Sequence, residues 1–312
     1  MTEQSDSLFR RSISSNQVLK SSLNFCRRKP LGAFGLAIII FFIMIGVIGG
    51  TIAPYDPLAV SAEFKLKGPN STQWFGGDSL GRDIFSRVLI GTRISIIVGL
   101  AVIVIGTTLG AVMGIVSAYY GGKVDMILQR IVDALMAFPS LLLAICIMSV
   151  LGVSLTNVVI ALAITNVPRA ARTIRSVALA IASSDYALAA TCIGANNFRL
   201  MFWHIAPNCV ASYLVIATAG LGIAIIAEAS LSFLGIGSPE ETITWGVMLS
   251  RSSLDSFAYA PHIGLFPGAA LTLLVFGINM FGDAMRAVSY THLRAHETDS
   301  YLVFRLLREK KK

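Results

Sequence analysis

The sequence predicts an all-α polytopic membrane protein, and three observations support this fold class. Of its 312 residues, 55% are hydrophobic and only 13% are charged, whereas about 25% of the residues of a soluble domain are charged. The mean hydropathy is +0.73. Several apolar runs approach or exceed the roughly 20 residues that a helix needs to cross a bilayer.

Six apolar runs predict six transmembrane helices. The fourth run begins near Leu155 and reaches Pro168 before charges appear, so we expect either a short helix or a kinked helix that continues. No cleavage site for a signal peptidase follows the first run, which we interpret as a retained helix. The expected spans are 31–53, 94–118, about 134–152, the run that starts at 155, about 209–235 and about 262–284.

The distribution of positive charge predicts the orientation of the chain. Nineteen of the 25 Lys and Arg residues lie before the first span, after the sixth, or in the second-to-third and fourth-to-fifth connections. Basic residues accumulate on the cytoplasmic side of membrane proteins, so both termini are expected in the cytoplasm. The formal charge of +8 therefore reflects topology and does not indicate a nucleic-acid partner.

Small residues recur at helical spacing inside two spans. Gly46 and Gly50 lie in the first span, and Gly106, Gly110 and Gly114 lie in the second. Such stripes allow two helix backbones to approach closely in a lipid environment. We expect both stripes to serve helix packing.

Enzymatic signatures are weak or absent. The sequence contains no G-x-x-x-x-G-K-[ST] motif and no H-E-x-x-H motif, so any ATP chemistry must belong to another chain. The four cysteines and four histidines have no metal-ligand spacing. We therefore expect no catalytic residues, no bound metal and no cofactor in this chain. The cysteines are interpreted as packing residues.

One alternative is a membrane serine hydrolase. Residues 77–81 read G-D-S-L-G, and Asp255 and His262 follow in the hydrolase order. That motif requires a strand before the serine, and no hydrophobic strand precedes it here. We expect the match to be fortuitous.

Glu228 is the carboxylate that lies deep in an apolar run, A-I-I-A-E-A-S-L. Ionisable residues inside a membrane span are functional candidates by default. Glu228 either lines the translocation pathway or anchors helix ends by hydrogen bonding. A secondary transporter would more often have several buried charges or paired broken helices, so that class is a less favoured alternative.

Two stretches carry a family resemblance. Residues 74–96, W-F-G-G-D-S-L-G-R-D-I-F-S-R-V-L-I-G-T-R-I-S-I, resemble the external loop and second-helix entry of permease subunits from the dipeptide/oligopeptide/nickel ABC importers. The family pattern is approximately F-G-T-D-x-x-G-R-D-x-x-S-R, with Gly77 here in place of Thr. The matching residues that we select as the external loop motif are Gly81, Arg82, Asp83 and Arg87.

The second stretch, residues 185–207, is similar to the cytoplasmic loop by which importer permeases dock onto their ATPase subunits. Leu188 stands where the general E-A-A-x-x-x-G motif has Glu, but the peptide-importer form of the motif fits well. Further matches, such as E-A-S-L-S-F-L-G-I-G and F-G-D-A-M-R, extend the resemblance over about residues 30–287. The matching loop residues are Asp185, Tyr186, Ala189, Ala190, Gly194, His204 and Pro207.

Residue chemistry is consistent with this role for 185–207. Alanines followed by a glycine suit a short helix that makes close contact. Pro207 is expected near the start of the fifth span, where its missing N–H has no cost.

The resemblance implies an ABC-importer permease fold and a division of labour among subunits. The chain would form the translocation pathway in the bacterial inner membrane. Its implied partners are a second permease subunit, two cytoplasmic ATPases that bind ATP, and an extracytoplasmic solute-binding protein. The implied substrates are dipeptides or oligopeptides, with nickel or another small solute as the alternative.

The resemblance divides the chain into three parts. Residues 1–30 form a cytoplasmic N-terminal arm and residues 31–287 form the transmembrane permease domain. Residues 288–312 resemble nothing in the family, so we interpret them as an atypical tail produced by a sequence artefact after Ala287.

Overall fold

The computed structural model describes residues 29–250 and 258–309, with side chains described up to residue 287. The expected N-terminal arm, 1–30, thus lies almost wholly outside the described residues. In the described part, the regular structure is helical, with one isolated bridge between Gly77 and Asp83. The main helices are α2 (Pro30–Ile52), α3 (Ile84–Tyr120), α4 (Gly122–Met136), α5 (Ser140–Leu151), α6 (Leu155–Ala182), α7 (Asp185–Cys192), α9 (Ala206–Phe233) and α12 (His262–Glu309).

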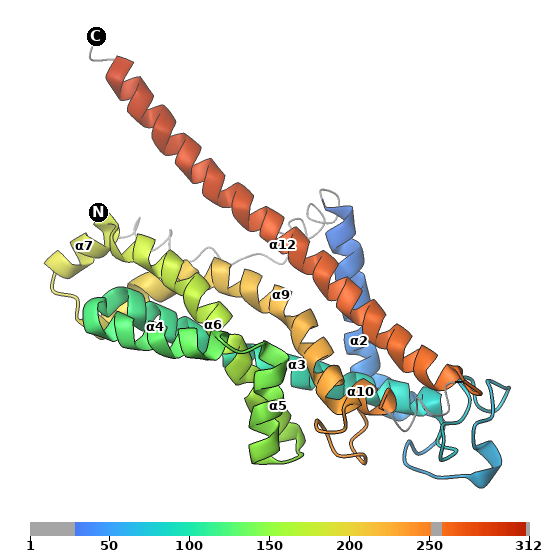
Figure 1. Cartoon of the computed structure of the whole chain (residues 1–312). Coiled ribbons are helices and arrows are strands. Elements are labelled where there is room, and N and C mark those ends of the chain that lie inside the picture. The colour runs from blue at the N-terminus through green and yellow to red at the C-terminus, as the bar shows by residue number, and fades with distance from the viewer. Residues whose placement is uncertain (1–28, 251–257, 310–312) are drawn as a thin grey trace, which may run out of the picture.

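Shorter helical segments connect the long helices. A 3-10 turn, η1 (Ala62–Phe64), lies in the loop 54–83, and α10 (Trp245–Met248) follows α9. Between α7 and α9 the chain forms α8 (Asn197–Arg199) and a π-helix, η2 (Leu200–Ile205). The loop 54–83 and α7 lie at opposite ends of the molecule (Figure 1). We call these the loop end and the α7 end.

Four described helical runs are long and apolar enough to cross a membrane: α2, α3, the run Asn197–Phe233, and His262–Ala287. A fifth candidate is the bent pair α4 and α5. The fourth predicted span corresponds to α6, which is more polar because Arg169, Arg172 and Arg175 lie in its second half. We expected either a short helix or a kinked helix that continues past Pro168. The structure shows a helix that continues, because α6 runs through Pro168 to Ala182.

The third span was expected as one helix over about 134–152, and this expectation is wrong. The helix breaks between Met136 and Ser140, and the two halves meet at 91°. Pro139 explains the break because proline lacks an N–H and disfavours helical conformation at the preceding residue, Phe138. The apolar arm that remains, α5, has only 12 residues.

The glycine stripe of α3 packs against α6, as predicted. A Cβ added to Gly106 or Gly114 would lie 2.6 Å from a backbone carbonyl oxygen of α6. One added to Gly110 would lie 2.6 Å from both the carbonyl oxygen of Val167 and the Cβ of Ala170. The two backbones are therefore in contact, and only glycine fits at these positions.

The prediction for α2 is half correct. A Cβ at Gly46 would lie 3.4 Å from the Cα of Arg93 in α3, but one at Gly50 would meet nothing within 4 Å. Gly49 makes the contact instead, with the backbone of Leu89. The i, i+4 pattern therefore identified the correct helix, but it located the face that contacts α3 only approximately.

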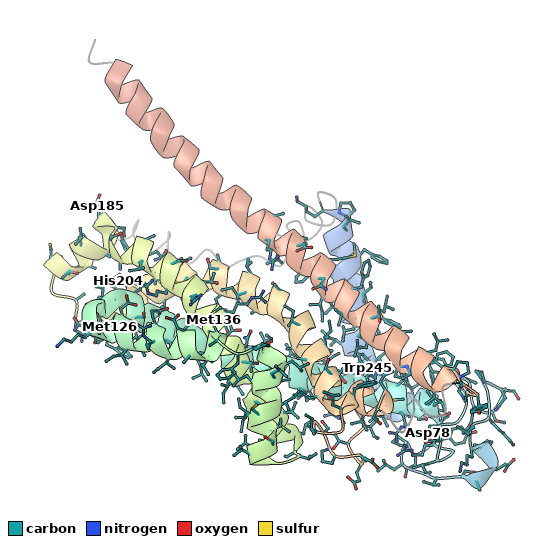
Figure 2. The ribbon with its side chains drawn as sticks, viewed as in Figure 1. Asp78, Met126, Met136, Asp185, His204 and Trp245 are labelled. Atoms are coloured by element: carbon teal, nitrogen blue, oxygen red, sulfur yellow. The ribbon has the colours of Figure 1, made fainter. Side chains whose placement is uncertain are left out.

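The buried core follows α3 from one end to the other. Ile84 and Val88 pack at the loop end around the fully buried Trp245. The Trp245 indole Nε1 donates a hydrogen bond to the Val88 carbonyl oxygen (3.2 Å), which ties α10 to the start of α3. Val98 and Ile115 belong to two further clusters along the helix. Figure 2 shows Trp245 near the loop end and His204 at the α7 end.

The final helix, α12, begins at His262, at the predicted start of the sixth span, and runs to Glu309. It extends well beyond the other helices (Figure 1). The described backbone of 288–309 thus continues the helix, and the origin of this tail in an artefact stays a prediction.

Candidate functional site

The segment 185–207 folds as a short helix, a tight turn and the start of a long helix. Asp185 lies in the first turn of α7, where a carboxylate is favourable next to the positive end of the helix dipole. Ala187 and Ala190 are buried, whereas Ala189 is exposed. The packed face of α7 therefore consists of Ala187 and Ala190 at i, i+3 spacing, and the predicted Ala189–Ala190 pair is divided between two faces.

Gly194 ends α7 in a left-handed conformation, with φ of +86°. Its N–H donates to the Thr191 carbonyl oxygen (3.0 Å), and the Ala195 N–H donates to the Ala190 carbonyl oxygen (3.1 Å). These two bonds form a Schellman motif, in which glycine is strongly preferred. A Cβ at Gly194 would meet nothing within 4 Å, so within this chain the backbone conformation, and not close packing, requires glycine.

Tyr186 and His204, which lie 18 residues apart in the sequence, meet in the structure. The Tyr186 hydroxyl lies 2.8 Å from the His204 Nδ1. The Asn208 amide donates to the His204 carbonyl oxygen (2.6 Å). Two residues of the predicted motif thus connect α7 to the long helix that follows it.

Pro207 lies in the first turn of α9, but the helix does not begin there. Residues Asn197–Phe233 form one continuous run of 37 residues, and Asn196 caps it by accepting a hydrogen bond from the Arg199 N–H. Pro207 thus lies near the start of α9, as expected, but the helical run that contains it extends back to Asn197. The π-helix η2 ends just before it, with the Ala206 N–H donating to the Met201 carbonyl oxygen, and this wider turn accommodates the proline ring.

Several large apolar side chains are exposed at the α7 end. Ile193 is 85% exposed and Trp203 is 73% exposed, and Leu188 and Phe198 are each more than half exposed. Sequence reasoning noted Leu188 only as a departure from the general motif. We call these four side chains the α7-end apolar surface.

Two ion pairs fasten α4 to α6 near the α7 end, and sequence reasoning missed both. The Arg175 guanidinium donates through Nε (2.7 Å) and Nη2 (2.5 Å) to the Asp125 carboxylate, which also accepts from the Ser117 hydroxyl. Arg172 donates to Asp133 (2.5 Å). The opposite charges were visible in the sequence, but their 50- and 39-residue separations gave no indication of contact.

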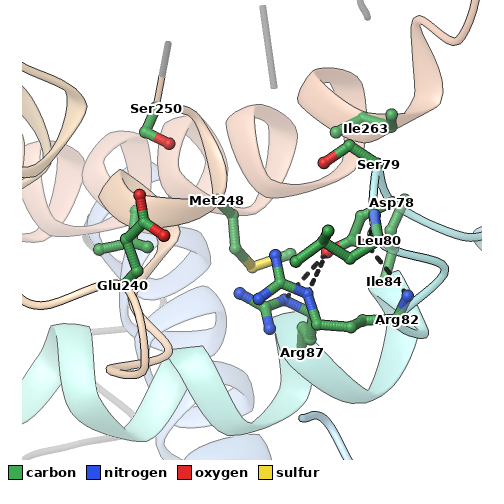
Figure 3. A pocket seen from close by; sticks show the side chains of 11 residues that line it. Asp78, Ser79, Leu80, Arg82, Ile84, Arg87, Glu240, Met248, Ser250 and Ile263 are labelled. Atoms are coloured by element: carbon green, nitrogen blue, oxygen red, sulfur yellow. Dashed lines mark hydrogen bonds and ion pairs between the residues drawn. The ribbon is translucent and has the colours of Figure 1, made fainter. Parts of the chain in front are cut away.

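Asp78 organises the external loop motif at the loop end. Its carboxylate accepts from the backbone N–H groups of Leu80 (2.8 Å) and Arg82 (2.9 Å), and from the Arg82 Nε (2.6 Å). Figure 3 shows the guanidinium groups of Arg82 and the buried Arg87 close to this carboxylate. The Nη1 of Arg87 donates to the Pro57 carbonyl oxygen (3.0 Å). The motif therefore folds the loop onto the start of α3.

The remaining motif residues have structural roles in the same loop. Asp83 caps α3 by accepting from the N–H (2.8 Å) and hydroxyl (2.7 Å) of Ser86, which explains why α3 begins before residue 94. Gly81 has φ of +78°, and a Cβ there would lie 1.8 Å from the Ser61 carbonyl oxygen. The adjacent cavity measures about 170 Å³, below the usual 300–1,000 Å³ of small-molecule sites.

The hydrolase alternative finds no support in the geometry. Ser79 lies in a turn, and no strand precedes it in the described part of the chain. The His262 Nε2 lies 3.2 Å from the carbonyl oxygen of Gly77. Asp255 lies outside the described residues.

Glu228 belongs to α9 and is fully buried where this helix meets the segment that leads to α10. The Ser232 hydroxyl donates to its Oε1 (2.9 Å), and the Ser238 N–H is close to the same hydroxyl (3.3 Å). Of the two alternatives, these contacts favour an anchor for the connection after α9. A role in the translocation pathway stays a prediction.

Comparison with known proteins identifies the family. Residues 106–294 match the binding-protein-dependent transport system inner membrane component family, and residues 25–69 match the N-terminal transmembrane domain of oligopeptide transport permease C. A dipeptide transport system permease protein from Alkalihalophilus pseudofirmus is 40% identical over 83% of this chain and 85% of its own. A glutathione transport system permease protein from Pectobacterium atrosepticum is 40% identical over 84% of this chain and 87% of its own.

The family match covers more than half of the chain, and these relatives cover most of it. Residues 185–207 and the three glycines of α3 that contact α6 lie inside the first matched region, and α2 lies inside the second. The chain belongs to the family of binding-protein-dependent transport system inner membrane components.

Proposed function

We propose that this chain is the permease subunit of an ATP-driven importer of short peptides, and that residues 185–207 dock on a separate ATPase subunit. The observation that carries the proposal is the α7-end apolar surface. Leu188 and Ile193 precede the apolar run Asn197–Phe233, and the other two members lie in its first two turns. Exposed apolar patches of this kind mark interaction surfaces. Ile193 and Trp203 are the most exposed members.

The connection from this surface into the spans supports a role in coupling. The run from Asn197 to Phe233 is helical without interruption, and the Tyr186–His204 hydrogen bond fastens α7 to it. A displacement of α7 would therefore move the long helix as one body. Coupling requires an element whose position is biased from both ends, and this continuous helix is the candidate.

The assembly that we propose has five chains. A second permease subunit completes the pathway, two cytoplasmic ATPase subunits bind and hydrolyse ATP, and a solute-binding protein delivers the substrate from outside. The α7 end faces the cytoplasm together with both termini, as the basic residues predict. The chain itself is neither an enzyme nor a cofactor-binding protein, and it has no nucleic-acid partner. Short peptides are the proposed substrate because the named relatives transport dipeptides and glutathione.

The function is tested by uptake of a labelled dipeptide into cells from which the chromosomal gene is deleted, with and without a plasmid that carries the gene. We expect the plasmid to restore uptake and depletion of ATP to abolish it. Restored uptake that persists without ATP would indicate a secondary transporter and refute the proposal.

Docking is tested by substitution of Ile193, with a matched control on α5. The Ile193→Ser change removes an apolar side chain that is 85% exposed, and Val150→Ser removes one that is 84% exposed. We expect Ile193→Ser to lower the amount of ATPase that co-purifies with the permease, and Val150→Ser to leave it unchanged. If both variants co-purify with as much ATPase as the wild type does, docking at the α7-end apolar surface is contradicted.

A further inference from the structure

A cavity that opens at exposed residues, among them Ser140 and Arg169, has the character of a solute site. It measures about 360 Å³ and lies between α3, α5, α6 and α9. Apolar side chains such as Ile103 and Ile223 form most of its wall, with the polar groups of Ser140, Asn166 and Arg169 among them. A mostly apolar cavity with a few polar groups is the usual composition of a small-molecule site.

One face of α6 brings the polar groups to the cavity. Leu162, Thr165, Asn166 and Arg169 follow at i, i+3, i+4 and i+7 and all line it. Asn166 is held in place, because its amide donates to the Thr107 hydroxyl of α3 (3.1 Å). Gly220 of α9 lines the same cavity and packs closely against Ile103, since a Cβ there would lie 2.8 Å from the Ile103 Cδ1.

Arg169 lies deep in α6 for a charged residue. It follows Leu155, the first residue of the helix, by 14 positions, which corresponds to about 21 Å of helix. The hydrocarbon core of a bilayer is about 30 Å thick. A guanidinium at this depth is costly in lipid, and such residues normally face a water-filled path or a partner.

The other two arginines of α6 already have partners. Arg172 pairs with Asp133 and Arg175 pairs with Asp125. Within the described part of the chain, no carboxylate oxygen lies within 4.0 Å of the Arg169 guanidinium. The bidentate donors of Arg169 are therefore available to an anion that enters the cavity.

We propose that this cavity is a transit site for the peptide and that Arg169 binds its carboxylate. The guanidinium matches the planar geometry of a carboxylate, and the Ser140 hydroxyl lines the same cavity as a second donor. The apolar wall accommodates the side chains of the peptide. This inference rests on the proposed function, and it identifies the residue that recognises the chemical group shared by all unmodified peptides.

The test measures equilibrium binding of a radiolabelled dipeptide to the purified permease–ATPase complex without the solute-binding protein. The same dipeptide with an amidated C-terminus serves as the second ligand. We expect Arg169→Gln to weaken binding of the free acid by roughly ten- to a hundredfold, as expected for loss of a charged hydrogen bond. Arg169→Lys should weaken it less, because it keeps the charge. The amide should bind weakly to the wild-type complex and equally weakly to Arg169→Gln.

Arg130→Gln is the matched control, because Arg130 is an exposed arginine of α4 that does not line the cavity. It should bind the free acid like the wild type, and co-elution of the subunits verifies assembly of each variant. Equal losses for the acid and the amide would assign Arg169 to assembly and overturn the proposal. Acid binding that is unchanged in Arg169→Gln, or that does not depend on the carboxylate in the wild type, would also overturn it. ATP-driven uptake by the wild-type importer would still support the proposed function in these cases.

Discussion

Gly110→Ala tests the close approach of α3 and α6. The new Cβ would lie 2.6 Å from both the Val167 carbonyl oxygen and the Ala170 Cβ, whereas non-bonded atoms prefer about 3.5–4.0 Å. The helices must therefore separate by about 1 Å. Gly106 and Gly114 lie equally close to α6, so the separation weakens contacts over two further turns.

The magnitude follows from two opposing effects. Overpacking of this kind costs about 1–3 kcal/mol, and alanine in place of glycine in a helix recovers about 0.5–1 kcal/mol. The middle values of these ranges leave a net destabilisation of about 1 kcal/mol. A loss of this size lowers Tm by roughly 2–4 °C for a domain of this size. Tm is measured on the detergent-purified importer complex by loss of the monodisperse peak after heating.

Gly50→Ala is the control for Gly110→Ala. It introduces the same methyl group into α2, where nothing lies within 4 Å. Alanine raises the helix propensity of this position and causes no clash, so the Tm of Gly50→Ala should be unchanged or higher. A Tm for Gly110→Ala equal to or above that of the wild type would refute the packing argument, and so would an equal decrease in Gly50→Ala.

Two further predictions concern the two ends of the molecule. Gly81→Ala should sharply reduce the yield of folded permease, because Gly81 has a positive φ and a Cβ there overlaps a backbone oxygen. The control is Gly68→Ala, which lies in the same loop but in open space and should leave the yield unchanged. Equal yields of the two variants would contradict this account. A double-mutant cycle on Asp125 and Arg175 should show a coupling energy of up to about 1 kcal/mol in thermal stability, the range for partly exposed ion pairs. Strict additivity of the two alanine variants would show that the pair contributes nothing.

Much of the fold was predictable because the bilayer imposes simple local requirements. Apolar runs located α2, α3, α9 and α12, and the small residues of α3 identified a packing face. Errors occurred where local backbone chemistry intervened. Pro139 divides the third expected span, Asp83 starts α3 early, and η2 extends the fifth helical run back before Pro207.

The candidate site was predictable only as a set of residues along the chain. The resemblance selected Tyr186, Gly194 and His204 before any contact was known. Their physical roles came from the structure: a hydrogen bond between the first and third, and a left-handed turn at the second. Ala187 was missed, because which alanines of α7 are buried depends on the neighbouring helices.

The sequence by itself determined that this is a helical membrane protein and which segments carry its family motifs, because hydropathy, charge and motif spacing are properties of the chain. Only the tertiary structure decided which charges meet. Arg172 and Arg175 are paired with α4, whereas Arg169, one turn earlier, faces a cavity. All three are arginines of the same helix, and their different roles follow from the way in which α3, α4, α5 and α9 pack around α6.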